Sequence, residues 1–338
     1  MMSERSPIPL IGVDNLGVRL NTSRGPAQAV RGVSFALKRG ETLGLVGESG
    51  CGKSVTALSL MGLLPDSAVV TGSIKLDGAE LVGLSDTDYC RLRGNRISMI
   101  FQEPMTALNP MHTIGHQVAE PLRRHKKYSA AQALKEAIAL LDRVGLPDPA
   151  KRVDAYPHQF SGGQRQRVTI AMALACEPDL LIADEPTTAL DVTIQGQILD
   201  LIADLVEERG MSMILISHDL GVIAENVQRM MVMYGGTVVE SGLTDDVFRR
   251  MGHPYTQGLF RARPRLGARK GTRLKTISGT VPELADLPAG CAFGDRCPLV
   301  EEKCRAALPP MVEVGPGHAV RCVRTDVSMA ETIGALSA

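Results

Sequence analysis

Aromatic residues and an excess of charge of either sign are what this sequence most plainly lacks. It contains no Trp, aromatics make up 3% of its 338 residues, and 37 Lys and Arg residues balance 37 Asp and Glu residues. The shortage of aromatics argues against a stacking platform for single-stranded nucleic acid. The charge balance argues against a global field that recruits nucleic acid or membrane. We therefore expect no nucleic-acid partner.

Long apolar runs are also absent. No stretch approaches the length of a membrane span, and residues 1–15 contain no apolar core of signal-peptide length. The sequence therefore predicts a soluble cytosolic protein that reaches a membrane only through partners. Its length leaves room for two domains.

One glycine-rich segment matches the phosphate-binding pattern G-x-x-x-x-G-K-[ST]. It follows a strand-like apolar stretch at 41–46 and precedes an apolar helical stretch at 55–64. Backbone N–H groups of such a loop close on phosphates, and the helix N-terminus adds partial positive charge. Lys53 would reach the β- and γ-phosphates, and Ser54 would ligate Mg²⁺. The candidate nucleotide-binding residues are Gly47, Glu48, Ser49, Gly50, Cys51, Gly52, Lys53 and Ser54.

Apolar strands alternate with helical patterns over much of the chain. Continuous apolar strands of this kind are typical of a parallel sheet covered on both faces, with functional groups at the carboxyl ends of its strands. The predicted strands lie at 41–46, 97–102, 180–183 and 211–216.

Two regions interrupt that alternation. The N-terminal part is β-rich, and turn signals at Gly72 and Asp77-Gly78 predict a hairpin over 69–82. A helical pattern then extends over about 105–175.

Two acids end one of the predicted strands. Asp184 and Glu185 follow the apolar run at 180–183. A carboxylate at the tip of a buried strand can hold Mg²⁺ through water, which is the role we predict for Asp184. Glu185 would orient or deprotonate the attacking water.

A second potential anion site precedes the helical pattern at 165–175. There a serine and two glycines open the helix, as they do in phosphate-binding turns. The residues are Ser161, Gly162, Gly163 and Gln164.

These motifs together resemble ABC-type ATPases over roughly residues 10–260. The resemblance is carried, in order and spacing, by Gly47 to Ser54, Gln102, Ser161 to Gln164, Asp184-Glu185, Thr188 to Asp191, and His218. It implies an α/β P-loop NTPase fold with a parallel core sheet, an N-terminal antiparallel β subdomain and an inserted helical subdomain at about 105–175. The ATPase domain would span 1–260, followed by a small irregular extension at 261–338.

The resemblance also implies a composite ATP site. In that family two subunits pack head to tail, so Ser161 and Gly163 would bind the γ-phosphate held by the opposite subunit. Gln102 would sense Mg²⁺ and the attacking water, His218 would clamp the γ-phosphate, and Asp191 would couple the two sites.

One feature departs from the family pattern. ABC proteins usually stack adenine on an aromatic residue upstream of the phosphate loop, and residues 10–34 contain no Phe, Tyr, Trp or His. Leu20 lies near the place where that aromatic residue is expected. The preference for ATP is therefore inferred from the family resemblance.

The C-terminal part resembles ATPases of the peptide and nickel importer branch. The similar segments are 101–110, 253–256, 277–282 and 291–298, and a basic stretch at 261–275 reads as a linker. The resemblance implies an ATPase that powers import of peptides or a related small solute. Its partners would be a second related ATPase subunit, two transmembrane permeases and an extracytoplasmic solute-binding protein. The chain would then lie at the cytoplasmic face of the inner membrane.

Other functions fit less well. ABC ATPases of DNA repair or translation need a long coiled coil or tandem ATPase domains, and the helical stretch at 105–175 is too short for such a coil. A non-catalytic module would be expected to lose Lys53, Asp184, Glu185 or His218, and all four are present.

Four cysteines crowd into the C-terminal extension: Cys291, Cys297, Cys304 and Cys322. They could be free thiols, a zinc site or a [4Fe–4S] cluster. Zinc sites usually show close C-x₂₋₄-C pairs, and none is present. Wider spacing favours the cluster, in which each thiolate binds a different iron.

Overall fold

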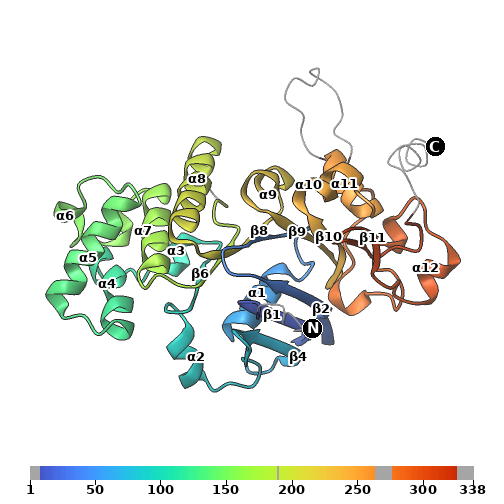
Figure 1. Ribbon diagram of the computed structural model, residues 1–338, viewed down its shortest axis with the longest axis horizontal. Helices are drawn as coiled ribbons and strands as arrows, with labels where there is room; N and C mark the ends of the chain where they lie inside the picture. Colours follow the sequence, from blue (N-terminus) through green and yellow to red (C-terminus); the bar gives the residue numbers. More distant parts are fainter. Residues whose placement is uncertain (1–7, 189, 263–275, 326–338) are drawn as a thin grey trace, which may run out of the picture. The chain divides into compact units, whose positions relative to one another are not determined.

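The computed structural model describes residues 8–188, 190–262 and 276–325 (Figure 1). Most of the predicted basic linker, 263–275, lies outside the described residues. Within the described part of the chain, no helix combines the length and apolar character that a membrane crossing requires. The chain divides into two compact units, each made of separate segments. The first contains residues up to Ile11, Ala36–Thr42 and Leu76–Ile216; the second contains Gly12–Phe35, Leu43–Lys75 and residues from Ser217 onward.

The sheet of the first unit is parallel, as the apolar runs predict. β6 (Ile97–Ile100), β7 (Leu180–Asp184) and β8 (Ser212–Ser217) pair in that order, and all their residues are buried. Buried strands have no solvent face, which explains why they consist of continuous apolar residues rather than alternating ones.

The predicted helical region is confirmed. Helix α5 (Ala130–Arg143) begins at a capping box between Ser129 and Gln132, and packs with α4 (Ile114–His125) and α7 (Gly162–Leu174). These three helices lie together in Figure 1. The remaining elements of this unit are β5 (Ala79–Glu80), α2 (Asp86–Leu92), α3 (Pro104–Ala107), α6 (Pro149–Arg152), the 3₁₀ turn η1 (Pro157–Gln159) and α8 (Val192–Arg209).

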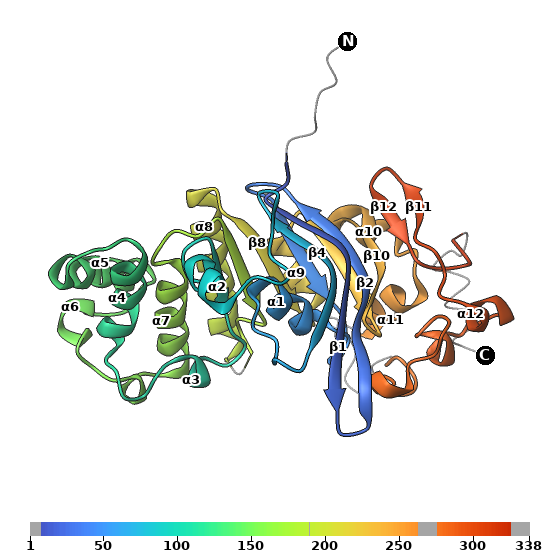
Figure 2. The ribbon, with the colours of Figure 1, turned by 90° about the horizontal axis from the view of Figure 1, so that it is seen from below.

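The N-terminal sheet belongs to the second unit. β1 (Ile11–Thr22) lies between β2 (Gly25–Leu37) and β4 (Val69–Leu76), as Figure 2 shows. Asp77 and Gly78 form the predicted turn after β4, both at positive φ. Gly72, however, lies inside β4 and is not a turn. A Cβ atom there would come within 2.4 Å of the Asn15 carbonyl oxygen, so the glycine permits close approach of β1.

A second set of strands in this unit carries the C-terminal extension. β3 (Thr42–Val46) is parallel to β9 (Arg229–Tyr234), and antiparallel pairs then join β9 to β10 (Thr237–Leu243), β10 to β12 (His318–Val320) and β12 to β11 (Val312–Gly315). The extension therefore adds strands to the sheet. The helical elements of the unit are α1 (Lys53–Met61), α9 (Leu220–Asn226), α10 (Thr244–Arg250), α11 (Pro254–Ala262), η2 (Leu284–Asp286), η3 (Gly294–Arg296) and α12 (Glu302–Ala306).

A buried carboxylate fixes the extension to β10. Glu240 is 0% exposed; it accepts hydrogen bonds from the N–H groups of Gly252 and His253, and one of its oxygens lies 2.8 Å from His318 Nε2. A buried charge is tolerated only when such partners replace water. His253 is itself buried beside this group, and burial lowers the pKa of its imidazole to about 4 despite the nearby Glu240.

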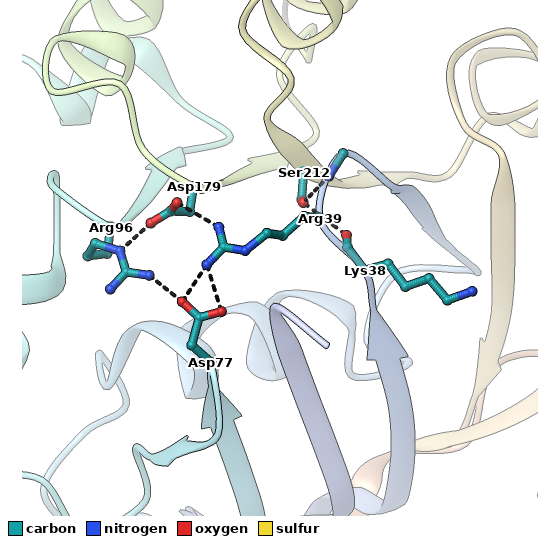
Figure 3. Close-up of polar contacts among 7 residues, drawn as sticks. Lys38, Arg39, Asp77, Arg96, Asp179 and Ser212 are labelled. Carbon is teal, nitrogen blue, oxygen red and sulfur yellow. Dashed lines mark hydrogen bonds and ion pairs between the residues drawn. The ribbon is translucent and has the colours of Figure 1, made fainter. Parts of the chain in front are cut away.

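A ring of charges joins four turns of the first unit (Figure 3). Arg39 bonds Asp77 at 2.6 Å and Asp179 at 3.0 Å, and Arg96 bonds the same two aspartates. Burial alone would raise the pKa of Asp179, but hydrogen bonds from Arg96 and Arg39 outweigh it and hold that pKa below its usual range. Ser212 adds to the attachment, since its hydroxyl donates to the Lys38 carbonyl and accepts from the Gly40 N–H. The ring ties the turn before β3 to the turn after β4 and to the starts of β6 and β7, and Ser212 adds the start of β8.

Asp179→Asn should lower the free energy of unfolding by roughly 1–2 kcal/mol, because two arginines lose a shared partner. Raising the salt concentration should reduce the difference in unfolding free energy between Asp179→Asn and the parent protein. Arg305→Gln, which removes an exposed ion pair with Asp295, is the matched control. It should change the free energy of unfolding by less than about 0.5 kcal/mol. Denaturant titration provides the measurement, and equal effects of the two variants would contradict a stabilising ring.

His253 predicts a pH dependence of stability. An unfolded imidazole titrates near 6.5 and the folded one at about 4, so the unfolded chain binds the extra proton between these values. The free energy of unfolding should therefore fall as the pH is lowered from 6.5 to 4, by roughly 3 kcal/mol from this group. His253→Gln should flatten the dependence, whereas replacement of the exposed His158 should leave it unchanged. The same slope in His253→Gln and the parent protein would show that this assignment is wrong.

Candidate functional site

The glycine-rich segment forms a tight loop between β3 and α1. Gly50 and Gly52 have φ values of 80° and 102°, in the region that residues with a Cβ atom rarely adopt. Gly52 occupies the N-cap position of α1, and a Cβ atom there would come within 2.7 Å of the Ala29 carbonyl oxygen. Both glycines are therefore required by geometry, and the loop delivers Lys53 as the first residue of the helix.

The Lys53 side chain folds back onto the loop. Its Nζ donates to the carbonyl oxygens of Gly47 at 2.7 Å and Glu48 at 3.1 Å, and the residue is only 5% exposed. Ser49 and Gly50 are exposed, while Ser54 is half-buried on the first turn of α1. One side of the loop is thus open, at a helix N-terminus, beside a buried cation. That combination suits a phosphate.

Cys51 fills the interior of this turn. Its side chain is 0% exposed, and burial raises the pKa of the thiol even though Lys53 lies nearby. The thiol is therefore protonated and enclosed at neutral pH, as expected of a small residue that fills a tight turn.

The two predicted acids stand at the end of β7. Asp184 is the last residue of the strand and is 5% exposed. Glu185 follows with φ at 44°, an uncommon conformation for a residue other than glycine. Backbone outliers of this kind gather at functional sites, because the surroundings must hold them. Here the Glu185 N–H donates to the Ile216 carbonyl at 3.0 Å.

Two polar side chains meet the Glu185 carboxylate in the first unit. Thr188 donates to its Oε2 at 3.0 Å, and Gln102 Nε2 donates to the same oxygen at 3.4 Å. Gln102 comes from the segment after β6, so the parallel pairing of β6 and β7 brings the two residues together. The Thr188 contact was not anticipated from the sequence, although a hydroxyl three residues after a carboxylate is a recognisable turn pattern.

The serine and glycines at 161–164 begin α7 as predicted. Ser161 is the N-cap: its hydroxyl accepts from the Gln164 N–H, and the Gln164 side chain accepts from the Ser161 N–H. Ser161 and Gly162 are exposed, and a Cβ atom on Gly163 would lie 3.0 Å from Ile194. The helix N-terminus therefore faces outward with little side-chain cover.

Asp191 and His218 are also exposed. Asp191 occupies the N-cap position of α8, but its side chain makes no capping hydrogen bond. His218 directly follows β8.

Family models match two parts of the chain. The model described as "ABC transporter" matches residues 30–188, and the one described as "Oligopeptide/dipeptide transporter, C-terminal region" matches 239–304. The dipeptide transport ATP-binding protein DppD of Bacillus subtilis is 53% identical, over 93% of this chain and 94% of its own length. This chain belongs to the oligopeptide/dipeptide (Opp/Dpp) family of ABC transporter ATP-binding proteins.

Other relatives agree with the assignment. The oligopeptide transport ATP-binding protein OppD of Mycobacterium tuberculosis is 48% identical over 94% of this chain and 52% of that longer protein. A dimeric structure of the ATP-binding cassette MJ0796, in a post-hydrolysis state with ADP and Pi, superposes with a TM-score of 0.62 and 28% identity. It covers 69% of this chain and 98% of its own.

These comparisons confirm the predicted fold, family and activity. The protein has the ABC ATPase fold, with its parallel core sheet, N-terminal antiparallel sheet and helical insertion. It is an ATP-binding subunit of a peptide-import ABC transporter, and an ATPase rather than a repair or translation factor.

The four cysteines of the C-terminal extension are half-buried or buried, and three of them lie within the region that matches the oligopeptide/dipeptide transporter model. Cys304 is 8% exposed, and its carbonyl accepts a hydrogen bond from the Cys291 N–H at 2.8 Å. Burial raises the pKa of Cys297 to about 12, and the thiols of Cys291, Cys322 and Cys304 add to the shift. Among the described residues, no group of three or more His, Cys, Asp and Glu side chains is arranged to hold a metal ion. The expected [4Fe–4S] cluster therefore remains a proposal.

Proposed function

We propose that this Opp/Dpp-family protein binds Mg²⁺·ATP through residues 47–54 and hydrolyses it to drive peptide import. The observation that carries the proposal is the loop itself, in which two glycines at positive φ place a buried Lys53 at the start of α1. On approach of the nucleotide, Lys53 would exchange the carbonyl oxygens of Gly47 and Glu48 for phosphate oxygens. Backbone N–H groups of the loop would complete the phosphate contacts.

Hydrolysis in this proposal uses Glu185 as the base. Its carboxylate takes a proton from a water molecule that attacks the γ-phosphorus, and the bond from that phosphorus to the bridging oxygen breaks to give ADP and phosphate. Gln102 and Thr188 hold the carboxylate oxygen Oε2, which fixes the direction of the remaining lone pairs. The constrained backbone at Glu185 supports a positioned rather than a mobile base.

The proposed magnesium ligands are oxygen donors. Ser54 offers a hydroxyl and Asp184 a buried carboxylate, the latter through water, and Mg²⁺ commonly takes few protein ligands besides water and phosphates. The ion would offset negative charge on the β- and γ-phosphates. That mode of binding is compatible with the absence, in the described residues, of a cluster of three ligating side chains.

We further propose that the site is completed by a second, related ATPase subunit. The open N-terminus of α7, with Ser161, Gly162, Gly163 and Gln164, would bind the γ-phosphate held by that subunit. His218 would clamp the γ-phosphate, and Asp191 would couple the two sites. The exposure of Ser161, Asp191 and His218 supports roles that need contact with a ligand or another chain.

The remaining partners follow from the family. We propose two transmembrane permeases and an extracytoplasmic solute-binding protein, with this chain held at the cytoplasmic face of the membrane by the permeases. The match of the C-terminal region to the oligopeptide/dipeptide transporter model supports peptides as the transported solutes.

Replacing the base tests the hydrolytic mechanism. In the complex assembled with its permeases, Glu185→Gln should retain ATP binding but release phosphate at least about a hundredfold more slowly, because the amide cannot accept the proton of water. Glu207→Gln, at an exposed position of α8, is the matched control and should hydrolyse ATP normally. Unchanged turnover in Glu185→Gln would remove this residue from the mechanism.

We also propose that Cys291, Cys297, Cys304 and Cys322 hold a [4Fe–4S] cluster. The support is that the Cys291 N–H is bonded to the Cys304 carbonyl, and that the thiols of Cys291, Cys322 and Cys304 all contribute to the raised pKa of Cys297. A cluster spreads its four thiolates over four iron atoms. It would supply redox-active iron and additional cross-links to the extension.

Metal analysis after anaerobic purification tests the cluster. The protein should contain iron and sulfide and absorb broadly at about 400 nm. Cys297→Ser should lose that absorption, whereas Cys90→Ser, in the first unit, should keep it. A stoichiometric zinc content would show that the cysteines form a zinc site instead of a cluster. Protein without any metal would show that the four thiols are free.

A further inference from the structure

An ion pair connects the C-terminal extension to the phosphate loop inside the second unit. Arg296, at the end of η3, donates to both carboxylate oxygens of Glu48, with Nη1–Oε2 at 2.6 Å and Nη2–Oε1 at 3.0 Å. The Arg296 side chain is 5% exposed and that of Glu48 is 28% exposed. Glu48 is the second residue of the glycine-rich loop, 248 residues away in sequence.

Arg296 is itself fixed by several further contacts. Its Nε donates to the Ser278 carbonyl at 3.0 Å, and its Nη1 lies 3.3 Å from the Tyr234 hydroxyl. The guanidinium also lies over the rings of Tyr234 and Phe293. A fork held at this many points is a rigid support rather than a mobile surface pair.

The same loop residue is held a second time, through its backbone. The Glu48 N–H donates to the Tyr255 hydroxyl at 2.7 Å, and Tyr255 is 0% exposed. Tyr255 packs against Tyr234 and against Phe293 of the extension, with ring centroids 4.6 and 5.3 Å apart. Arg296 thus holds the side chain of Glu48 and Tyr255 holds its backbone, and both of these residues pack against Tyr234 and Phe293.

Glu48 passes this constraint to the nucleotide-binding cation. Its carbonyl oxygen is one of the two that accept from Lys53 Nζ, at 3.1 Å. A shift of Glu48 would therefore move the loop backbone beside Lys53. Phosphate binding depends on the spacing of such backbone groups to fractions of an ångström.

We propose that Arg296 is a positioning residue for ATP: it holds Glu48, and through Glu48 the phosphate loop, in the conformation that binds nucleotide. The C-terminal extension is then part of the ATP-binding machinery and not only an appendage. This inference rests on the proposed function, in which residues 47–54 bind ATP. Removal of Arg296 should raise the ATP dissociation constant without abolishing the fold, because the loop glycines and Tyr255 remain.

A double-mutant cycle on the full-length protein tests the proposal by calorimetric titration with Mg²⁺·ATP. Arg296→Gln should weaken binding about tenfold, equivalent to about 1.4 kcal/mol. Arg296→Lys keeps the positive charge but not the two-pronged guanidinium. Its ATP dissociation constant should lie between those of Arg296→Gln and the parent protein. In a Glu48→Gln background, Arg296→Gln should have little further effect, since the partner that it acts through is already neutral.

Arg24→Gln is the matched control. Arg24 pairs with Asp286 and Glu283 of the same extension, but these groups are exposed and neither ion pair includes a residue of the loop at 47–54. This variant should bind ATP within about twofold of the parent protein. The melting temperature of each variant, measured in parallel, separates loss of folded protein from loss of affinity. Arg296→Lys and Glu48→Gln extend the test if Arg296→Gln does not fold.

The outcomes separate the two claims. If the parent protein binds ATP, Lys53→Ala does not, and the Arg296 variants bind with unchanged affinity, the positioning role is wrong and the proposed function stands. A lower melting temperature of the Arg296 variants with unchanged ATP affinity would also contradict the positioning role, because it would show that Arg296 only stabilises the fold. If the parent protein itself fails to bind ATP, the proposed function fails.

Discussion

The phosphate loop depends on a backbone conformation that few residues can adopt. Gly50 and Gly52 lie at positive φ, and Gly52 also leaves no room for a Cβ atom beside the Ala29 carbonyl. That conformation leads the chain from β3 into α1 and places Lys53 at the start of the helix. The neighbouring elements hold this loop in place. β3 precedes it, α1 follows it, and the aromatic cluster of Tyr234, Tyr255 and Phe293 lies beside Glu48.

The C-terminal extension gains a physical role from this arrangement. It is attached to the rest of the second unit through β12, through the buried Glu240 beside His318, and through Arg296 at the loop. These attachments involve buried or nearly buried charges, which are costly to leave without partners. Cys297 directly follows Arg296, so the two features adjoin in the chain.

Much of the fold and part of the site could be predicted from local sequence. The apolar runs that became β6, β7 and β8 and the helix beginning at Ser129 obey rules that act over a few residues. The loop glycines, Asp184 and Glu185 were predictable because motif spacing encodes strand–loop–helix geometry. Gly72 was misread, because a glycine inside a strand and one in a turn give the same local signal.

Contacts between distant segments could not be predicted in this way. Nothing near Glu48 indicates Arg296, and nothing near Glu240 indicates His318, because pairing of this kind arises only when the chain is folded. The charge ring of Arg39, Asp77, Arg96 and Asp179 belongs to the same class, with each member in a different turn. Gln102 and Glu185 were linked beforehand only through family resemblance, and the pairing of β6 with β7 supplies the physical reason.

Hydrogen exchange of the phosphate-loop amides tests the central claim most directly. Addition of Mg²⁺·ATP to the full-length protein should slow exchange in the peptide that covers residues 47–54, because its N–H groups then donate to phosphate oxygens. Lys53→Ala should show no such protection at the same nucleotide concentration. Exchange in this peptide that is unchanged by ATP, with protection elsewhere in the chain, would contradict the account.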